Sequence, residues 1–124
     1  MKTCILILLA GGTGALARYF LSAWIQTFAG SGFPWGTITV NILGCLIFGL
    51  LWTLVEEKYM ISPQLGLIVL TGFVGSFTTF STMTFETFTL MKSSAWLTAA
   101  AYLISGQFLG IVAAFAGVKM GSIF

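Results

Sequence analysis

Four long apolar stretches fill almost the whole chain and are separated only by short polar turns. A helix needs about 20 predominantly apolar residues to cross the hydrocarbon core of a bilayer. The stretches cover approximately residues 3–28, 35–55, 63–91 and 95–118, so each meets that requirement. The sequence therefore predicts an all-α membrane protein, with residues 1–124 forming a single domain of four transmembrane helices.

The turns between these stretches carry residues that end or begin helices. Pro34 follows a glycine-rich segment, and the charged segment 56–58 closes the second stretch. Pro63 suits the first turn of a helix, and Ser93 or Ser94 is expected to cap the fourth helix. Apolar and polar residues do not alternate, which argues against a transmembrane β-barrel. Because the turns are short, we expect neighbouring helices to be antiparallel.

Charged side chains are scarce, and their identity excludes several classes of protein. They make up 6% of the chain, whereas soluble domains average about 25%. A net charge of +2 is too small to indicate nucleic-acid binding, and histidine is absent. Aspartate is also absent, and no glycine-rich phosphate loop follows a strand. The chain is therefore not expected to be an enzyme.

The positive charges leave the orientation in the membrane open. Four spans put both termini on one side together with Lys2, Lys58 and Lys119, whereas Lys92, with or without Arg18, marks the other side. The asymmetry of Lys and Arg in short loops sets orientation, and here it is small. Either one orientation wins by a narrow margin, or the chain inserts both ways and pairs head-to-tail.

Arg18 ends a stripe of small residues in the first span. Gly11, Gly14, Ala15 and Arg18 fall at i, i+3, i+4 and i+7, on one face of a helix. Small residues allow another helix to approach closely. Two roles for the arginine are open: its side chain extends to the membrane surface, or it is a fixed positive charge that attracts an anion.

The second and fourth spans each carry a polar residue on a defined helix face. In the second span, the face comprises Thr37, Asn41, Gly44 and Phe48 at i, i+4, i+7 and i+11. Asn41 lies well inside the second span and either ties two helices together or offers its N–H donors to an anion. In the fourth span, Tyr102 shares a stripe with Gly106 and Gly110, and the Gly-x-x-x-Gly spacing favours close helix packing.

The third span contains an unusual polar segment, "GSFTTFSTMTFE", at residues 75–86. Its hydroxyl side chains belong to Ser76, Thr78, Thr79, Ser81, Thr82 and Thr84. Glycines followed by residues that cap helices indicate a place where one helix stops and another begins. Such a break exposes carbonyls that can hold a cation and amides that can hold an anion. An unbroken helix with hydroxyls bonded to its own carbonyls is the alternative, and the density of hydroxyls favours the break.

Beyond the break, an aromatic face and a polar strip lie side by side. Phe80 and Met83 fall at i and i+3, beside Ser81, Thr82 and Glu86. The edge of an aromatic ring is slightly positive and can face an anion. Glu86 is expected either to lie at the end of this polar route near the membrane surface or to be protonated.

With these motifs in view, the chain resembles the Fluc-type fluoride channels, also called the CrcB family. The similarity covers nearly the whole chain and is carried by "GGTGALARY", "GTITVNILGC" and above all "TGFVGSFTTFST". The resemblance implies a channel that exports fluoride passively across the bacterial inner membrane and so relieves fluoride toxicity. It also implies an antiparallel, dual-topology homodimer in lipid, with two pores and a central structural sodium ion.

The resemblance further implies roles for individual residues. Backbone carbonyls of Gly75 and Thr78 from both subunits would hold the sodium ion. The implied fluoride pathway comprises Asn41, Phe80, Met83, Thr39, Ser81, Thr82, Glu86, Tyr102 and Arg18. The sequence departs from the family pattern at Met83, where a second phenylalanine is expected. Methionine lacks a positive ring edge, so we expect permeation to be slower or less selective than with phenylalanine.

Two other kinds of function are consistent with a chain of four apolar spans. Small multidrug transporters also have four spans, but they need a carboxylate midway along the first span, and here that span contains only Arg18. A non-conducting membrane subunit, whose polar residues merely hold helices together, remains a further alternative and predicts no ion flux.

Overall fold

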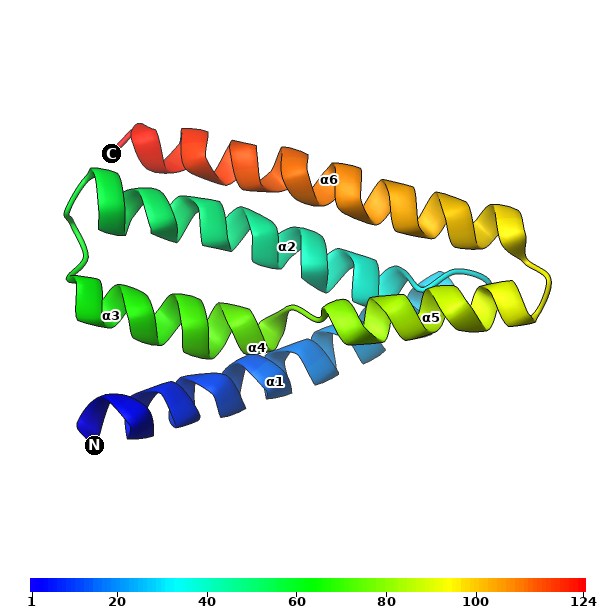
Figure 1. Ribbon diagram of the computed structural model, residues 1–124, viewed down its shortest axis with the longest axis horizontal. Coiled ribbons are helices and arrows are strands. Elements are labelled where there is room, and N and C mark those ends of the chain that lie inside the picture. Colours follow the sequence, from blue (N-terminus) through cyan, green and yellow to red (C-terminus); the bar gives the residue numbers. More distant parts are fainter.

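The computed structural model describes all 124 residues, and every regular element in it is helical. Four helical segments are long and apolar enough to cross a membrane: Lys2–Ala29, Trp35–Glu57, Pro63–Lys92 and Trp96–Ser122. Both chain ends lie at the same end of the bundle (Figure 1). The prediction of an all-α protein with four membrane-spanning helices is therefore confirmed.

Two of the four segments are composite. The elements, in chain order, are α1 (Lys2–Ala29), α2 (Trp35–Trp52), η1 (Thr53–Glu57), α3 (Pro63–Leu67), η2 (Ile68–Val74), α4 (Gly75–Phe77), α5 (Phe80–Lys92) and α6 (Trp96–Ser122). The π-helix η1 continues α2, and the π-helix η2 joins α3 to α4 without interruption. Neither π-helix was predicted, because no local residue pattern announces a turn widened by one residue.

The connections are built largely from side chains close to them. Gln26 donates through Nε2 to the carbonyl oxygens of Gly30 and Phe33, and its Oε1 accepts from the Gly36 amide at 3.1 Å. This one side chain ties the end of α1 to the start of α2. Pro63 lies in the first turn of α3, as the sequence predicts, and the Ser62 side chain caps that helix by accepting from the Leu65 amide.

The cap expected for the fourth helix is wrong. Ala95 is the N-cap of α6, and no side chain caps it. Ser94 instead takes a left-handed conformation, with φ of 64°, and Ser93 ends α5. Both serines are used to reverse the chain, so neither is in place to cap the next helix.

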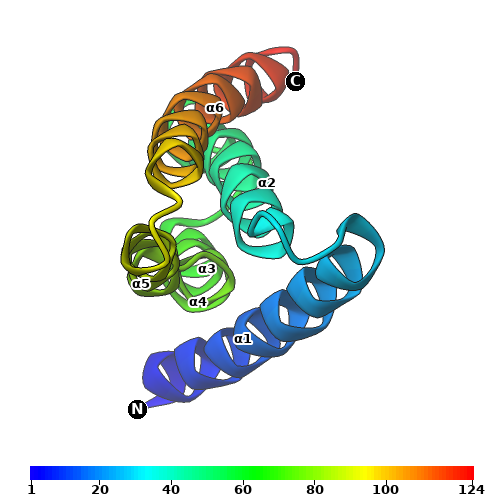
Figure 2. The same cartoon turned by 90° about the vertical axis from the view of Figure 1, so that its right-hand side faces the viewer.

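Glycines set the spacing between the helices. α2 and α6 lie side by side along most of their length, while α1 crosses obliquely against η2 and α4 (Figures 1 and 2). A Cβ atom on Gly117 would collide with the backbone of Leu46, and one on Gly14 would collide with the backbone of Phe73. The contact stripe of α6 continues beyond the predicted Gly106 and Gly110 to Gly117 and Gly121, which the sequence analysis missed.

The third segment is interrupted, as the sequence predicts. Thr78 and Thr79 both have extended backbones, with ψ of 159° and 111°, between α4 and α5. Most large apolar side chains point outward, and the largest buried cluster is small, formed by Ile38, Met83 and Tyr102. This cluster lies beside the break, because Met83 is in the first turn of α5.

Candidate functional site

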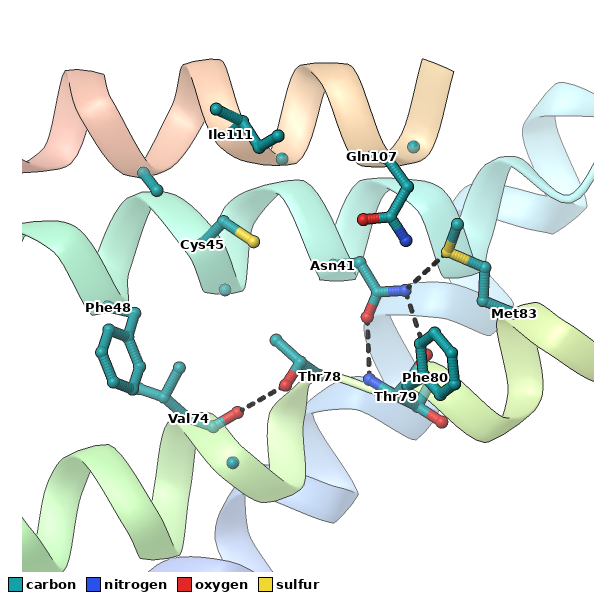
Figure 3. A pocket seen from close by; sticks show the side chains of 15 residues that line it. Asn41, Cys45, Phe48, Val74, Thr78, Thr79, Phe80, Met83, Gln107 and Ile111 are labelled. Carbon is teal, nitrogen blue, oxygen red and sulfur yellow. Dashed lines mark hydrogen bonds between the residues drawn. The ribbon is translucent and has the colours of Figure 1, made fainter. Parts of the chain in front are cut away.

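Asn41 holds the break from the facing helix α2. Its Oδ1 accepts from the Thr79 amide at 2.8 Å, and its Nδ2 donates to the Thr79 carbonyl at 3.1 Å (Figure 3). The side chain therefore pairs with one residue of extended backbone much as a neighbouring strand would. This satisfies two polar groups that the interrupted helix leaves without partners.

A cluster of hydroxyls forms the start of α5. The Thr79 hydroxyl accepts from the Thr82 amide at 3.3 Å and donates to Thr82 Oγ1 at 2.9 Å. Ser81 Oγ lies 3.5 Å from the same Thr79 oxygen. Thr79 is buried, while Ser81 and Thr82 are exposed. The predicted polar residues Ser81 and Thr82 therefore lie at a helix N-terminus, where amides and the helix dipole favour negative charge.

Gly75 and Thr78 lie on the carbonyl side of the break. In a continuous helix their carbonyls would accept from the amides of Thr79 and Thr82. The Thr79 amide donates to Asn41 instead, and the Thr82 amide donates to the Thr79 hydroxyl. Arg18 Nη1 lies 3.5 Å from the Thr78 carbonyl oxygen. The arginine thus points toward the break rather than toward the membrane surface.

A groove of about 400 Å³ runs along this side of the bundle. Its walls come from α2, η2, α4, the break, α5 and α6, and none of its side chains is charged. The lining residues are Asn41, Gly44, Cys45, Phe48, Val74, Gly75, Thr78, Thr79, Phe80, Met83, Gly106, Gln107, Gly110, Ile111 and Ala114. The groove therefore combines apolar walls with amide and hydroxyl groups at its centre (Figure 3).

Phe80 and Met83 both line the groove but differ in their surroundings. Phe80 is 73% exposed, whereas Met83 is only 4% exposed and packs against Ile38 and Tyr102. The Met83 sulfur lies 3.6 Å from Asn41 Nδ2, which places a weak acceptor against the amide (Figure 3).

Glu86 belongs to a second polar cluster, next to Met83 along α5. Its Oε1 accepts from the Thr37 hydroxyl at 2.8 Å, and its Oε2 accepts from the Tyr102 hydroxyl at 2.6 Å. Thr37 and Tyr102 are buried, and Phe33 packs edge-on against the tyrosine ring. The carboxyl group is therefore held between three helices by both of its oxygens.

Thr39 lies apart from this cluster. Its hydroxyl donates to the Trp35 carbonyl at 2.7 Å, one turn back on its own helix. The structure places Thr37, not Thr39, beside Glu86. Thr37 shares a helix face with Asn41 at i and i+4, and that spacing was a signal capable of identifying it.

Gln107 is a further groove residue that the sequence analysis missed. It is the one amide side chain in α6 and points from that helix into the groove, on the side of Asn41 (Figure 3). An amide within an apolar span is itself a signal for an internal polar site. Cys45 also lines the groove.

Comparison with known proteins matches residues 5–118 to the family described as "CrcB-like protein, Camphor Resistance (CrcB)". The "Fluoride-specific ion channel FluC" of Nitrosococcus oceani is 49% identical over 117 residues, which cover 94% of each chain. Proteins of the same name from Nitratidesulfovibrio vulgaris and Oceanobacillus iheyensis are 43% and 39% identical, over 98% and 97% of this chain and 98% and 92% of their own. With its four membrane-spanning helices the protein is a multi-pass membrane protein. Because the similarity extends through all four helices, the chain belongs to the CrcB-like family.

Proposed function

We propose that this protein is a fluoride-specific ion channel that lets fluoride leave the cell passively across the bacterial inner membrane and so relieves fluoride toxicity. The observation that carries the proposal is the broken third helix, whose hydroxyl-rich α5 N-terminus borders an uncharged groove. The names of the relatives in the CrcB-like family support fluoride as the ion.

The groups around the break suit a small anion. Fluoride is strongly hydrated, so it enters only where several donors replace its water. Ser81 and Thr82 offer hydroxyls at the positive end of α5, and the exposed Phe80 ring offers its slightly positive edge. Asn41 contributes an N–H that faces only the Met83 sulfur, a weak acceptor that an anion can displace.

Glu86 acts in this proposal through its neighbours. Both carboxyl oxygens accept hydrogen bonds, from Thr37 and from Tyr102, and Glu86 does not line the groove. It fixes the tyrosine and threonine hydroxyls on one side of the route. Because Thr37 and not Thr39 contacts Glu86, Thr37 takes the place of Thr39 in the proposed fluoride pathway.

The working unit in this proposal is an antiparallel homodimer in lipid. In one copy the groove is open along its side, so a second copy is needed to enclose a route for an ion. The small difference in positive charge between the two ends of the bundle suits a chain that inserts in both orientations.

A structural sodium ion fits the carbonyl side of the break. The carbonyls of Gly75 and Thr78 have lost their helical partners, and both residues line the groove. No cluster of His, Cys, Asp or Glu offers a different kind of metal site. Carbonyl oxygens are suitable ligands for a hard cation, and two copies would supply a set of them. Bound there, sodium would supply a fixed positive charge between the subunits.

Ion efflux from liposomes tests the proposal. Vesicles containing purified protein are loaded with fluoride or chloride, and release is followed with ion-selective electrodes against protein-free vesicles. We expect rapid release of fluoride and little release of chloride. Release of neither ion from wild type and from Met83→Phe would favour a non-conducting subunit. Uptake of a cationic dye driven by a proton gradient would favour the multidrug transporter, although the first span lacks the carboxylate that such transporters need.

A further inference from the structure

Arg18 lies near the middle of α1 and makes one hydrogen bond within the chain. It is the only charged side chain between Lys2 and the end of that helix, and it is half-buried. Its Nη1 lies 3.5 Å from the Thr78 carbonyl oxygen, at the outer limit of a hydrogen bond. An arginine is permanently charged and costly to place at this depth, so its position requires a specific partner.

The small residues of α1 explain how the arginine reaches the break. Gly14 packs on the backbone of Phe73, and a Cβ on Gly11 would lie 3.2 Å from Ser76 Oγ. These contacts bring α1 against η2 and α4 one and two turns before Arg18. The small-residue stripe of α1 therefore places the Arg18 guanidinium next to the Thr78 carbonyl, where the first half of the third helix ends.

The two ends of the break have opposite electrostatic character. The helix from Pro63 to Phe77 ends at Thr78, where its dipole is negative, and α5 begins at Thr79, where its dipole is positive. An exposed negative end beside the α5 N-terminus would repel an anion. A positive charge at the Thr78 carbonyl offsets that end and leaves the amide end electropositive. Because a carbonyl oxygen has two lone pairs, Arg18 and the proposed sodium ion can both approach it.

We propose that Arg18 is a positioning residue for permeation, which holds the Thr78 carbonyl and neutralises the carbonyl end of the break without contacting the permeating ion. The inference rests on the proposed fluoride channel function. Asn41 holds Thr79 from α2, and Arg18 holds Thr78 from α1, so the two extended residues are fixed from two different helices. Arg18 does not line the groove, which separates this role from that of a direct anion ligand.

The test compares Arg18→Gln and Arg18→Lys with Lys58→Gln. Lys58 is a matched control because its Nζ also donates to a helix-end carbonyl, that of Ser122 at 2.9 Å, far along the chain from the break. Two readouts are taken: fluoride efflux from liposomes, and hydrogen–deuterium exchange of the peptide containing residues 76–84. The exchange measurement reports on the break even if the protein conducts no ion.

We expect Arg18→Gln to lower fluoride flux about tenfold and to speed exchange at the break by a similar factor, because the positive charge beside the Thr78 carbonyl is lost. Arg18→Lys restores part of both, and Lys58→Gln changes neither. Unchanged flux and exchange in Arg18→Gln would overturn the inference while leaving the channel function in place. Lower flux with unchanged exchange would also overturn it, because the arginine would then act on the ion directly. Absent flux in both wild type and Met83→Phe would instead refute the proposed function.

Discussion

At the scale of single residues, Asn41 is the side chain that contacts the break most directly, through hydrogen bonds to Thr79. It satisfies both backbone groups of Thr79, and its remaining N–H faces Met83. Asn41→Leu keeps the size but leaves the Thr79 amide and carbonyl unpaired, which costs about 1–3 kcal/mol for each buried group. We expect a lower unfolding temperature in detergent and loss of fluoride flux.

Gln64→Leu is the control for this change. This substitution also removes a side-chain amide, but the Gln64 amide donates only to the Thr3 hydroxyl, at the exposed end of the bundle. It should leave flux and unfolding temperature almost unchanged. If Asn41→Leu behaves like Gln64→Leu, Asn41 does not hold the break.

Thr37 and Thr39 provide a second comparison on one helix. Thr37→Val removes a hydroxyl donor to Glu86, whereas Thr39→Val removes only a bond to its own helix. An intramolecular hydrogen bond contributes about 0.5–1.5 kcal/mol, so we expect Thr37→Val to reduce fluoride flux several-fold. Thr39→Val should conduct like wild type in the same efflux assay. Lower flux in Thr39→Val with unchanged flux in Thr37→Val would instead place Thr39 in the fluoride pathway.

Met83 separates the effect of a ring from that of a sulfur atom. Met83→Phe introduces a positive ring edge and removes the acceptor that faces Asn41, whereas Met83→Leu only removes the acceptor. We expect Met83→Phe to conduct fluoride faster or with greater selectivity over chloride, with Met83→Leu no better than wild type. Equal gains from both variants would assign the effect to the sulfur, and no gain from phenylalanine would refute the argument from the ring edge.

At the scale of elements, the glycines of α1 determine whether that helix packs correctly. A Cβ at position 14 would collide with the Phe73 backbone, whereas Gly12 faces open space. We therefore expect Gly14→Ala to destabilise the protein by about 1–3 kcal/mol and Gly12→Ala to be neutral or slightly stabilising. Thermal unfolding in detergent distinguishes the two. Equal effects would mean that α1 is not seated on η2 as described.

The elements also show what a sequence can and cannot reveal here. Hydropathy and the turn residues Pro34 and Pro63 locate the four spans, and glycines among hydroxyls locate the break, because these signals are local. The π-helix η2 and the partner of Arg18 depend on how α1 and the third helix meet. Choosing Thr37 over Thr39 requires the rotation of α2 relative to α5. Such information exists only once the helices are packed.

At the scale of the whole molecule, the structure removes Arg18 from the charges that orient the chain. The guanidinium lies at the break rather than in a loop, so Lys92 alone faces the positive charges at the other end. That end also carries Glu56 and Glu57, and Lys58 is bonded to the Ser122 carbonyl. Acidic residues contribute little to orientation. The proposed dual topology therefore depends on a margin that one or two lysines can shift.

Lysines placed at opposite ends of the bundle test this directly. Gly32 lies in the turn between α1 and α2, and Met60 lies in the turn at the other end; both are exposed. With a topology reporter fused to the C-terminus, wild type should give signal on both sides of the membrane. Gly32→Lys and Met60→Lys should shift the signal in opposite directions, because added positive charge favours the cytoplasmic side.

Fluoride resistance then links orientation to function. Because an antiparallel dimer needs both orientations, each lysine variant alone should lower the fluoride resistance of bacteria, and coexpression of the two should restore it. Neither substitution touches the groove, so restoration cannot come from a repaired ion route. A wild-type reporter signal on one side only, together with full resistance, would refute the antiparallel arrangement and require the groove to be enclosed by copies that face the same way.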